Sequence, residues 1–74
     1  MSPHPNDVRT LLLRHHNGRC VEYTGIILSR FSPFVAALYW TGEEWRQVVM
    51  PEKNIGERTT LTAEQAAALP KEEP

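Results

Sequence analysis

The residues best suited to chemistry lie near one another in the N-terminal half: His15, His16 and Cys20, with His4 as a further candidate. Zinc takes four ligands, often imidazole and thiolate groups, and usually finds them in pairs separated by short spacers. His15 and His16 are adjacent, and on a helix they would point about 100° apart, so both could not face one ion. With one thiol and no paired motif, the pattern predicts no metal site, and we expect the chain to hold no cofactor.

Cys20 is also the candidate for a catalytic nucleophile, with His15 or His16 as its base. No residue at a recognisable spacing supplies an orienting group or an oxyanion hole. The carboxylates Glu43 and Glu44 fall together in a turn, and the four glycines stand singly, so the sequence contains no phosphate-binding loop. A buried strand cysteine is the simpler interpretation. We therefore predict that the chain is not an enzyme, and keep a small enzyme or enzyme subunit using Cys20 as an alternative.

Length and composition narrow the remaining classes of protein. The 74 residues make one domain, which we place at residues 6–70, between a flexible arm of residues 1–5 and a charged tail of residues 71–74. A single cysteine excludes an intrachain disulfide, the usual staple of small secreted domains. No apolar run approaches the ~20 residues of a membrane span, and the N-terminus MSPHPNDVR lacks the features of a signal peptide. These features predict a cytoplasmic protein that does not contact membranes.

The formal charge of −1 is unevenly distributed along the chain. Residues 1–42 carry four arginines against two acids, a charge of +2, whereas residues 43–74 carry four cations against seven acids, a charge of −3. Ordinary solvated surface explains such a pattern. A dipolar molecule whose basic end meets a charged partner would explain it as well. The alternative function is therefore nucleic-acid binding through the N-terminal arginines Arg9, Arg14, Arg19 and Arg30.

Residues 6–16 favour a helix. Asn6 can cap it, Asn17-Gly18 would end it, and helical spacing places four side chains on one stripe: Val8, Leu11, Leu12 and His15. Asn-Gly is also a strong signal for a hairpin turn, so residues 8–15 could instead be a strand paired with residues 19–24. The sequence leaves both open, and the three contiguous leucines favour the helix.

Three strands follow this segment. Residues 20–31 are rich in β-branched and aromatic side chains, and a bulge at Gly25 would restore a continuous apolar face where the alternation breaks. Residues 34–40 are apolar on both faces, which is typical of a central strand. A turn at residues 41–44 then pairs this strand with residues 45–50, placing Trp40 opposite Trp45 and Tyr39 opposite Arg46.

The C-terminal element is a short helix. Thr62 and Gln65 fit a capping box, the alanines after them favour helix, and Pro70 follows its end. The predicted fold is therefore α+β: a small two-layer sandwich in which a three-stranded antiparallel meander packs against an N-terminal and a C-terminal helix. If residues 6–16 form a strand, the fold becomes a four- or five-stranded sheet or small barrel with one C-terminal helix.

The order helix–strand–strand–strand–helix resembles that of double-stranded RNA-binding domains over most of the chain. That family grips phosphates with lysines at the start of its last helix. The matching stretch here, Thr62-Ala63-Glu64-Gln65, is not basic, so the resemblance assigns no function to any residue.

The predicted function comes from the aromatic residues of the second and third strands. Two short helices cannot cover both faces of a small meander, so part of its apolar surface should stay accessible and have the composition of a protein interface. We expect a small non-catalytic protein-binding module that docks a sheet face or edge on a larger protein or on a second copy of itself. An accessory inhibitor or adaptor encoded by a phage or mobile element would suit this size. The predicted protein-binding residues are Tyr39, Trp40, Trp45, Arg46 and Val48.

Overall fold

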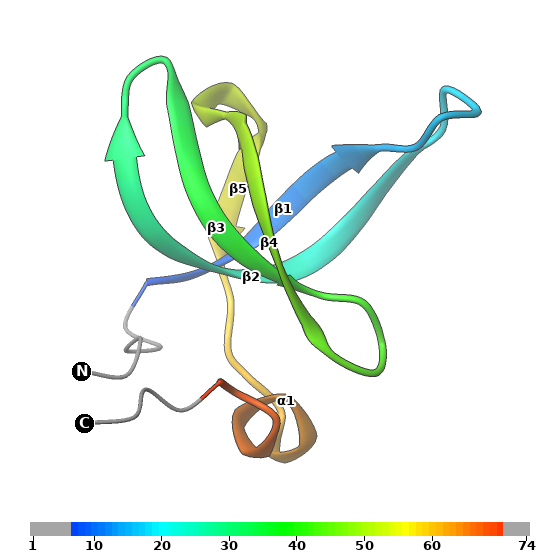
Figure 1. Ribbon diagram of the computed structural model, residues 1–74, viewed down its shortest axis with the longest axis vertical. Coiled ribbons are helices and arrows are strands. Elements are labelled where there is room, and N and C mark those ends of the chain that lie inside the picture. Colours follow the sequence, from blue (N-terminus) through cyan, green and yellow to red (C-terminus); the bar gives the residue numbers. More distant parts are fainter. Residues whose placement is uncertain (1–6, 71–74) are drawn as a thin grey trace.

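The computed structural model describes residues 7–70, and within them the chain forms five strands and one short α-helix. The strands are β1 (Val8–Arg14), β2 (Cys20–Phe31), β3 (Phe34–Trp40), β4 (Trp45–Pro51) and β5 (Ile55–Arg58), with a 3₁₀ turn η1 (Glu52–Asn54) before β5 and the helix α1 (Ala63–Ala67) near the C-terminal end. The strands make one sheet in the order β4-β3-β2-β1-β5, and each pair of neighbouring strands is antiparallel (Figure 1). The predicted arm and tail lie outside the described residues.

The predicted N-terminal helix is wrong: its residues from Val8 to Arg14 form β1, which pairs with β2 from Val8 opposite Ile26 to Arg14 opposite Cys20. Five residues, 15–19, join the two strands, and their turn is closed by a bond from the Gly18 N–H to the His15 carbonyl. Gly18 has a φ of 84°, a conformation that glycine adopts without strain. The hairpin alternative that the Asn-Gly pair indicated is therefore the observed structure.

The predicted bulge at Gly25 is also wrong, because β1 and β2 keep one register across this residue. The irregularity lies between Ile27 and Ser29, where β2 pairs with β3. Gly25 serves packing instead: a Cβ there would overlap the Cγ and Cδ1 atoms of Leu11. The alternation breaks at Gly25 because both faces of the sheet are covered at this point, so that Ile26 is fully buried on one face while Leu11 fills the other.

The predicted hairpin of β3 and β4 is confirmed. Trp40 lies opposite Trp45, and Tyr39 lies opposite Arg46, in an unbroken register that extends to Phe34 opposite Pro51. The Thr41 N–H donates to the carbonyl of Glu44 at 3.0 Å, which closes the turn. β3 is the most buried of these strands, as its two apolar faces predicted.

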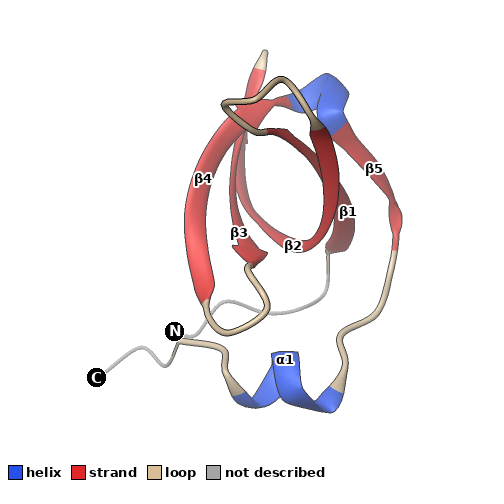
Figure 2. Ribbon diagram, turned by 90° about the vertical axis from the view of Figure 1, so that its right-hand side faces the viewer, coloured by secondary structure: helices blue, strands red, loops and turns tan. Residues whose placement is uncertain are grey.

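The sheet curls strongly, so that β4 and β5 stand on opposite sides of an arc (Figure 2). We call the two sides of the curled sheet its inner and outer faces. The inner face holds one cluster of buried side chains, which consists of Leu11, Val35, Ala37 and Met50. Partly buried apolar side chains pack against this cluster. The outer face holds a second cluster of buried side chains, which consists of Val8, Ile26, Leu38 and Trp45. The helix α1 and the segment before it cover this cluster. Leu61 and Leu69, on either side of α1, pack against this outer cluster.

The C-terminal helix confirms the predicted capping box. The Gln65 N–H donates to the Thr62 hydroxyl at 3.1 Å, and the Thr62 N–H donates to the side-chain oxygen of Gln65 at 2.9 Å. Residues 7–70 thus form a small, mostly antiparallel domain of five strands and one short helix. The two-helix meander is wrong in its helix count, the five-stranded alternative fits, and the element order no longer matches that of double-stranded RNA-binding domains. No helix among these residues is long and apolar enough to cross a membrane.

Candidate interaction surfaces

The two tryptophans of the predicted binding set belong to the outer cluster. Trp45 is buried, and its indole Nε1–H donates to the carbonyl oxygen of Gln65 at 2.9 Å. Trp40 is half-buried, and its ring packs on that of Trp45 with the centroids 5.4 Å apart and the planes at 58°. Trp45 therefore ties α1 to the sheet, and little of its surface is open to a partner.

Tyr39 and Val48 are half-buried and pack against the inner cluster. The ring of Tyr39 meets that of Tyr23 edge-on, with the centroids 5.2 Å apart. Arg46 is exposed, and its Nε donates to the Glu44 carboxylate at 2.7 Å, which raises the pKa of the guanidinium. Of the five predicted residues, Arg46 is thus the most accessible, and the binding role of the set stays a prediction.

A different group of apolar side chains is the most exposed on this sheet. Phe31 is 50% exposed, Phe34 is 44% exposed and Val49 is 57% exposed. Phe31 and Phe34 lie opposite each other at the corner between β2 and β3, with ring centroids 6.4 Å apart. Val49 lies opposite Ala36, two residues along β3 from Phe34, so the alternation of the strand puts it on the same face as Phe34. We call these three residues the apolar patch.

The apolar patch continues the outer face beyond the part that α1 covers. Alternation along β3 places Phe34 on the same face as Leu38, which lies in the outer cluster under the helix. Beside the patch is an open hollow of about 620 Å³, lined by Ser32, Pro33, Phe34, Pro51, Glu52 and Lys53. The sequence carried a signal for this surface, because two phenylalanines flank the tight Ser32-Pro33 corner, where a helix packed on the middle of the sheet does not reach.

Two of the four predicted nucleic-acid-binding arginines are held by carboxylates. The Nε of Arg9 lies 2.7 Å from one Asp7 oxygen, and Arg30 bridges Asp7 at 2.9 Å and Glu52 at 3.1 Å. The hydrogen bond from Arg9 and that from Arg30 lower the pKa of the Asp7 carboxyl, and Asp7 in turn raises the pKa of Arg30. This network joins the start of β1 to the end of β2 and to η1, so it explains Arg9 and Arg30 as structural residues.

The other two arginines, Arg14 and Arg19, flank the turn of the β1–β2 hairpin, which projects from the body of the domain (Figure 1). Both are exposed, and neither forms an ion pair with any residue between 7 and 70. His15 and His16 lie between them on the same tip. The structure therefore brings Arg14 and Arg19 together and separates them from Arg9 and Arg30.

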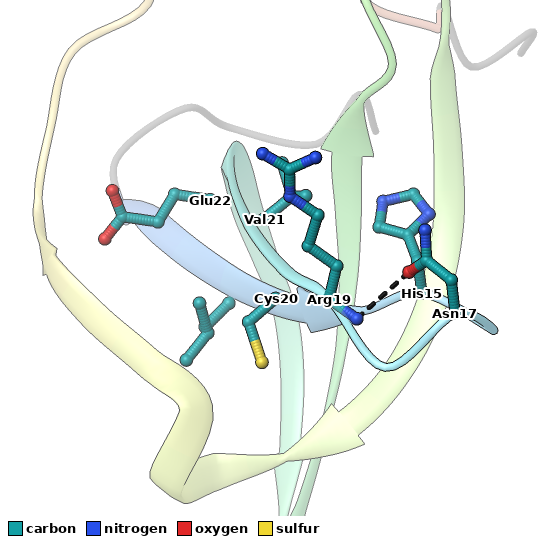
Figure 3. Close-up of a pocket in the computed structure, with 7 residues that line it drawn as sticks. His15, Asn17, Arg19, Cys20, Val21 and Glu22 are labelled. Carbon is teal, nitrogen blue, oxygen red and sulfur yellow. Dashed lines mark hydrogen bonds between the residues drawn. The ribbon is translucent and has the colours of Figure 1, made fainter.

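A hollow of about 660 Å³ opens at this tip, with Arg19 and Cys20 among its lining residues (Figure 3). Cys20 is on a strand, as predicted, but it is exposed and not buried. Figure 3 shows the thiol of Cys20 and the imidazole of His15 pointing in different directions, and the His15 Nε2 instead lies 2.7 Å from the Tyr23 hydroxyl. The pairing of Cys20 with His15 as nucleophile and base is thus not formed at this site.

The remaining candidates for metal ligands do not converge in the described part of the chain. Among residues 7–70 there is no group of three or more histidine, cysteine or carboxylate side chains placed to hold an ion, and His4 lies outside that range. Comparison with known proteins adds no assignment: no family model matches the chain, and no curated protein or solved structure is significantly similar to it.

Proposed function

We propose that the chain is a small non-catalytic protein-binding module that docks on a larger protein through the apolar patch of Phe31, Phe34 and Val49. The observation that carries this proposal is the position of the patch. The patch lies on the outer face of the sheet, next to the part of that face that α1 covers. Each of its three side chains is 44–57% exposed. Contiguous exposed apolar surface of this kind is typical of interaction sites.

The chemistry of the patch supports a protein partner. Aromatic side chains are enriched in the buried core of interfaces, and the rim of an interface is polar. Here the Arg30–Glu52 ion pair and Lys53 lie close to the corner that carries the two phenylalanines. Covering the exposed half of one phenylalanine removes about 100 Å² from water, which contributes about 2 kcal/mol to binding. The two rings together could supply a substantial share of a micromolar affinity.

Affinity capture from a lysate of the source organism tests the proposal when a patch variant and a matched surface variant are compared. The patch variant is Phe31→Ser/Phe34→Ser, and the control is Leu12→Ser, since Leu12 is 37% exposed and lies on β1, away from the patch. We expect the wild type and the control to recover the same protein, and the patch variant to recover at least about tenfold less of it. Undiminished recovery by a folded patch variant would contradict the proposal.

A second candidate function is nucleic-acid binding by the β1–β2 hairpin tip, supported by the clustering of Arg14 and Arg19 with two histidines on a projecting turn. Each phosphate contact adds about 0.9 to the slope of log affinity against log salt for duplex DNA. We expect a slope of about 2 if both arginines bind phosphates. The double variant Arg14→Gln/Arg19→Gln would then abolish the salt dependence, whereas Arg9→Gln would leave it unchanged. Binding that is insensitive to both variants would rule out the tip.

A further inference from the structure

The two edge strands of the described sheet, β4 and β5, differ in how well they are protected against pairing with a strand of another molecule. Natural sheets protect their edges with short strands and charged residues. β5 follows this rule, since it has four residues and two of them are Glu57 and Arg58. β4 has seven residues, and its one charged side chain, Arg46, is already bonded to Glu44. The unprotected edge is therefore β4.

The hydrogen-bond pattern shows which backbone groups of β4 are available. The bonds from Thr41 N–H to Glu44 C=O and from Glu52 N–H to Pro33 C=O mark the two ends of the β3–β4 ladder. In an antiparallel ladder the hydrogen-bonded pairs occur at every second residue. The register therefore directs residues 46, 48 and 50 toward β3, and leaves Trp45, Gln47 and Val49 with N–H and C=O groups facing away from the sheet.

The side chains along this edge suit a strand partner. Gln47 and Val49 are exposed, and Val49 is the most exposed large apolar residue among those described. Both project from the outer face, on which Trp45 is buried farther along the strand. An added strand would cover Val49 and satisfy the outward-facing backbone groups at the same time.

We propose that β4 pairs antiparallel with β4 of a second copy of the chain across a two-fold axis near Gln47, which joins two sheets into one. This inference goes beyond the proposed function and does not rest on it. The axis places Gln47 opposite its counterpart and Val49 opposite Trp45 of the second copy, and allows about six backbone hydrogen bonds between the copies. This pairing covers Val49 of the apolar patch, whereas Phe31 and Phe34 lie on the strands behind this edge and stay open to a larger partner.

A second copy is favoured by charge as well as by shape. A two-fold contact brings identical surfaces together, so an unpaired charge near its axis would face its own copy. Arg46, the charged residue of β4, is neutralised within its own chain by Glu44 at 2.7 Å. In the proposed register it lies opposite Val48 of the second copy, so no like charges are directly opposed.

Sedimentation velocity over a range of chain concentrations, with amide hydrogen exchange measured by NMR, tests this pairing. We expect a reversible dimer in which the amides of Trp45, Gln47 and Val49 become protected as the concentration rises. Val49→Lys should weaken dimerisation at least about tenfold. Leu12→Lys is the matched control, since it puts the same charge at an exposed leucine away from this edge and should leave dimerisation unchanged.

Three results would overturn the pairing of copies. One is a chain that stays monomeric at the highest concentration, and another is a dimer in which those three amides exchange freely, because that dimer uses a different surface. The third is protection of these amides only when a protein captured through Phe31 and Phe34 is added, which assigns the edge to that protein. A monomer that still captures a partner through the patch would leave the proposed function intact.

Discussion

Trp45→Phe separates a structural tryptophan from a binding one. In the folded chain the Trp45 Nε1–H donates to the Gln65 carbonyl at 2.9 Å, and the indole is buried beneath α1. Phenylalanine keeps an aromatic ring at this position but removes the donor. Since the Gln65 carbonyl also accepts from the Ala68 N–H at 3.3 Å, it retains one partner, and the lost bond costs about 1 kcal/mol.

The smaller ring adds a second cost. Phenyl buries about 40 Å² less apolar surface than indole, which corresponds to about 1 kcal/mol at ~25 cal/mol per Å². The sum of about 2 kcal/mol is a large fraction of the stability of a domain this small. At about 4–8 °C per kcal/mol for a chain of this size, the melting temperature of Trp45→Phe should fall by about 8–16 °C.

Thermal unfolding followed by circular dichroism measures this change. Trp40→Phe is the control: the ring of Trp40 packs against that of Trp45 at a tilt but is only half-buried, so its replacement should cost less. Capture of a partner by folded Trp45→Phe below its melting temperature should equal that of the wild type. A melting temperature equal to that of the wild type would refute the anchoring of α1 by Trp45. Loss of partner capture by the folded variant would instead show that Trp45 is part of the binding surface.

Three further predictions concern the fold. Gly25→Ala should destabilise the domain by about 1–3 kcal/mol in urea, because its methyl group overlaps the Cγ and Cδ1 atoms of Leu11, and its cost should be smaller in a Leu11→Ala chain, which lacks both atoms. Hydrogen bonding to Arg9 lowers the pKa of Asp7, so this carboxylate stabilises the fold at neutral pH and loses that contribution as the pH falls through its lowered pKa. Asp7→Asn should therefore lower the urea midpoint at pH 7, and the difference from the wild type should shrink as the pH falls and vanish below the lowered pKa of Asp7. Thr62→Ala should cost about 1 kcal/mol through loss of the helix cap, and a smaller change in the urea midpoint would mean that packing alone holds α1.

The sequence predicted the β3–β4 hairpin and the capped helix because their signals are local. Turn residues at 41–44 set the register of the hairpin, and Thr62 with Gln65 sets the start of α1. The N-terminal strand was missed because both faces of the sheet are covered. Val8 packs in the outer cluster and Leu11 in the inner one, and a spacing of three residues on a strand with two buried faces matches the spacing of one helical stripe.

The same physical cause, a sheet covered on both faces, explains the misplaced bulge. Tyr23 faces inward and Ile26 outward, so the break in alternation at Gly25 reflects two covered faces and not a change of register. Sequence alone showed that β3 has two apolar faces, but not which end of the outer face α1 would cover. That choice depends on tertiary contacts such as Trp45 with Gln65, which no local pattern encodes.

The size of α1 explains why apolar surface remains open on so small a domain. The seven residues of β3 extend over about 23 Å, at about 3.3 Å for each residue. The five residues of α1 extend over about 7.5 Å, and a helix is about 10 Å wide, so this helix covers less than half of the strand whether it lies along the strand or across it. It covers the end with Leu38 and Trp45 and leaves the end with Phe34 and Val49. The exposed surface of these side chains gains nothing from burial within the domain, which is the physical basis for proposing that they contact another molecule.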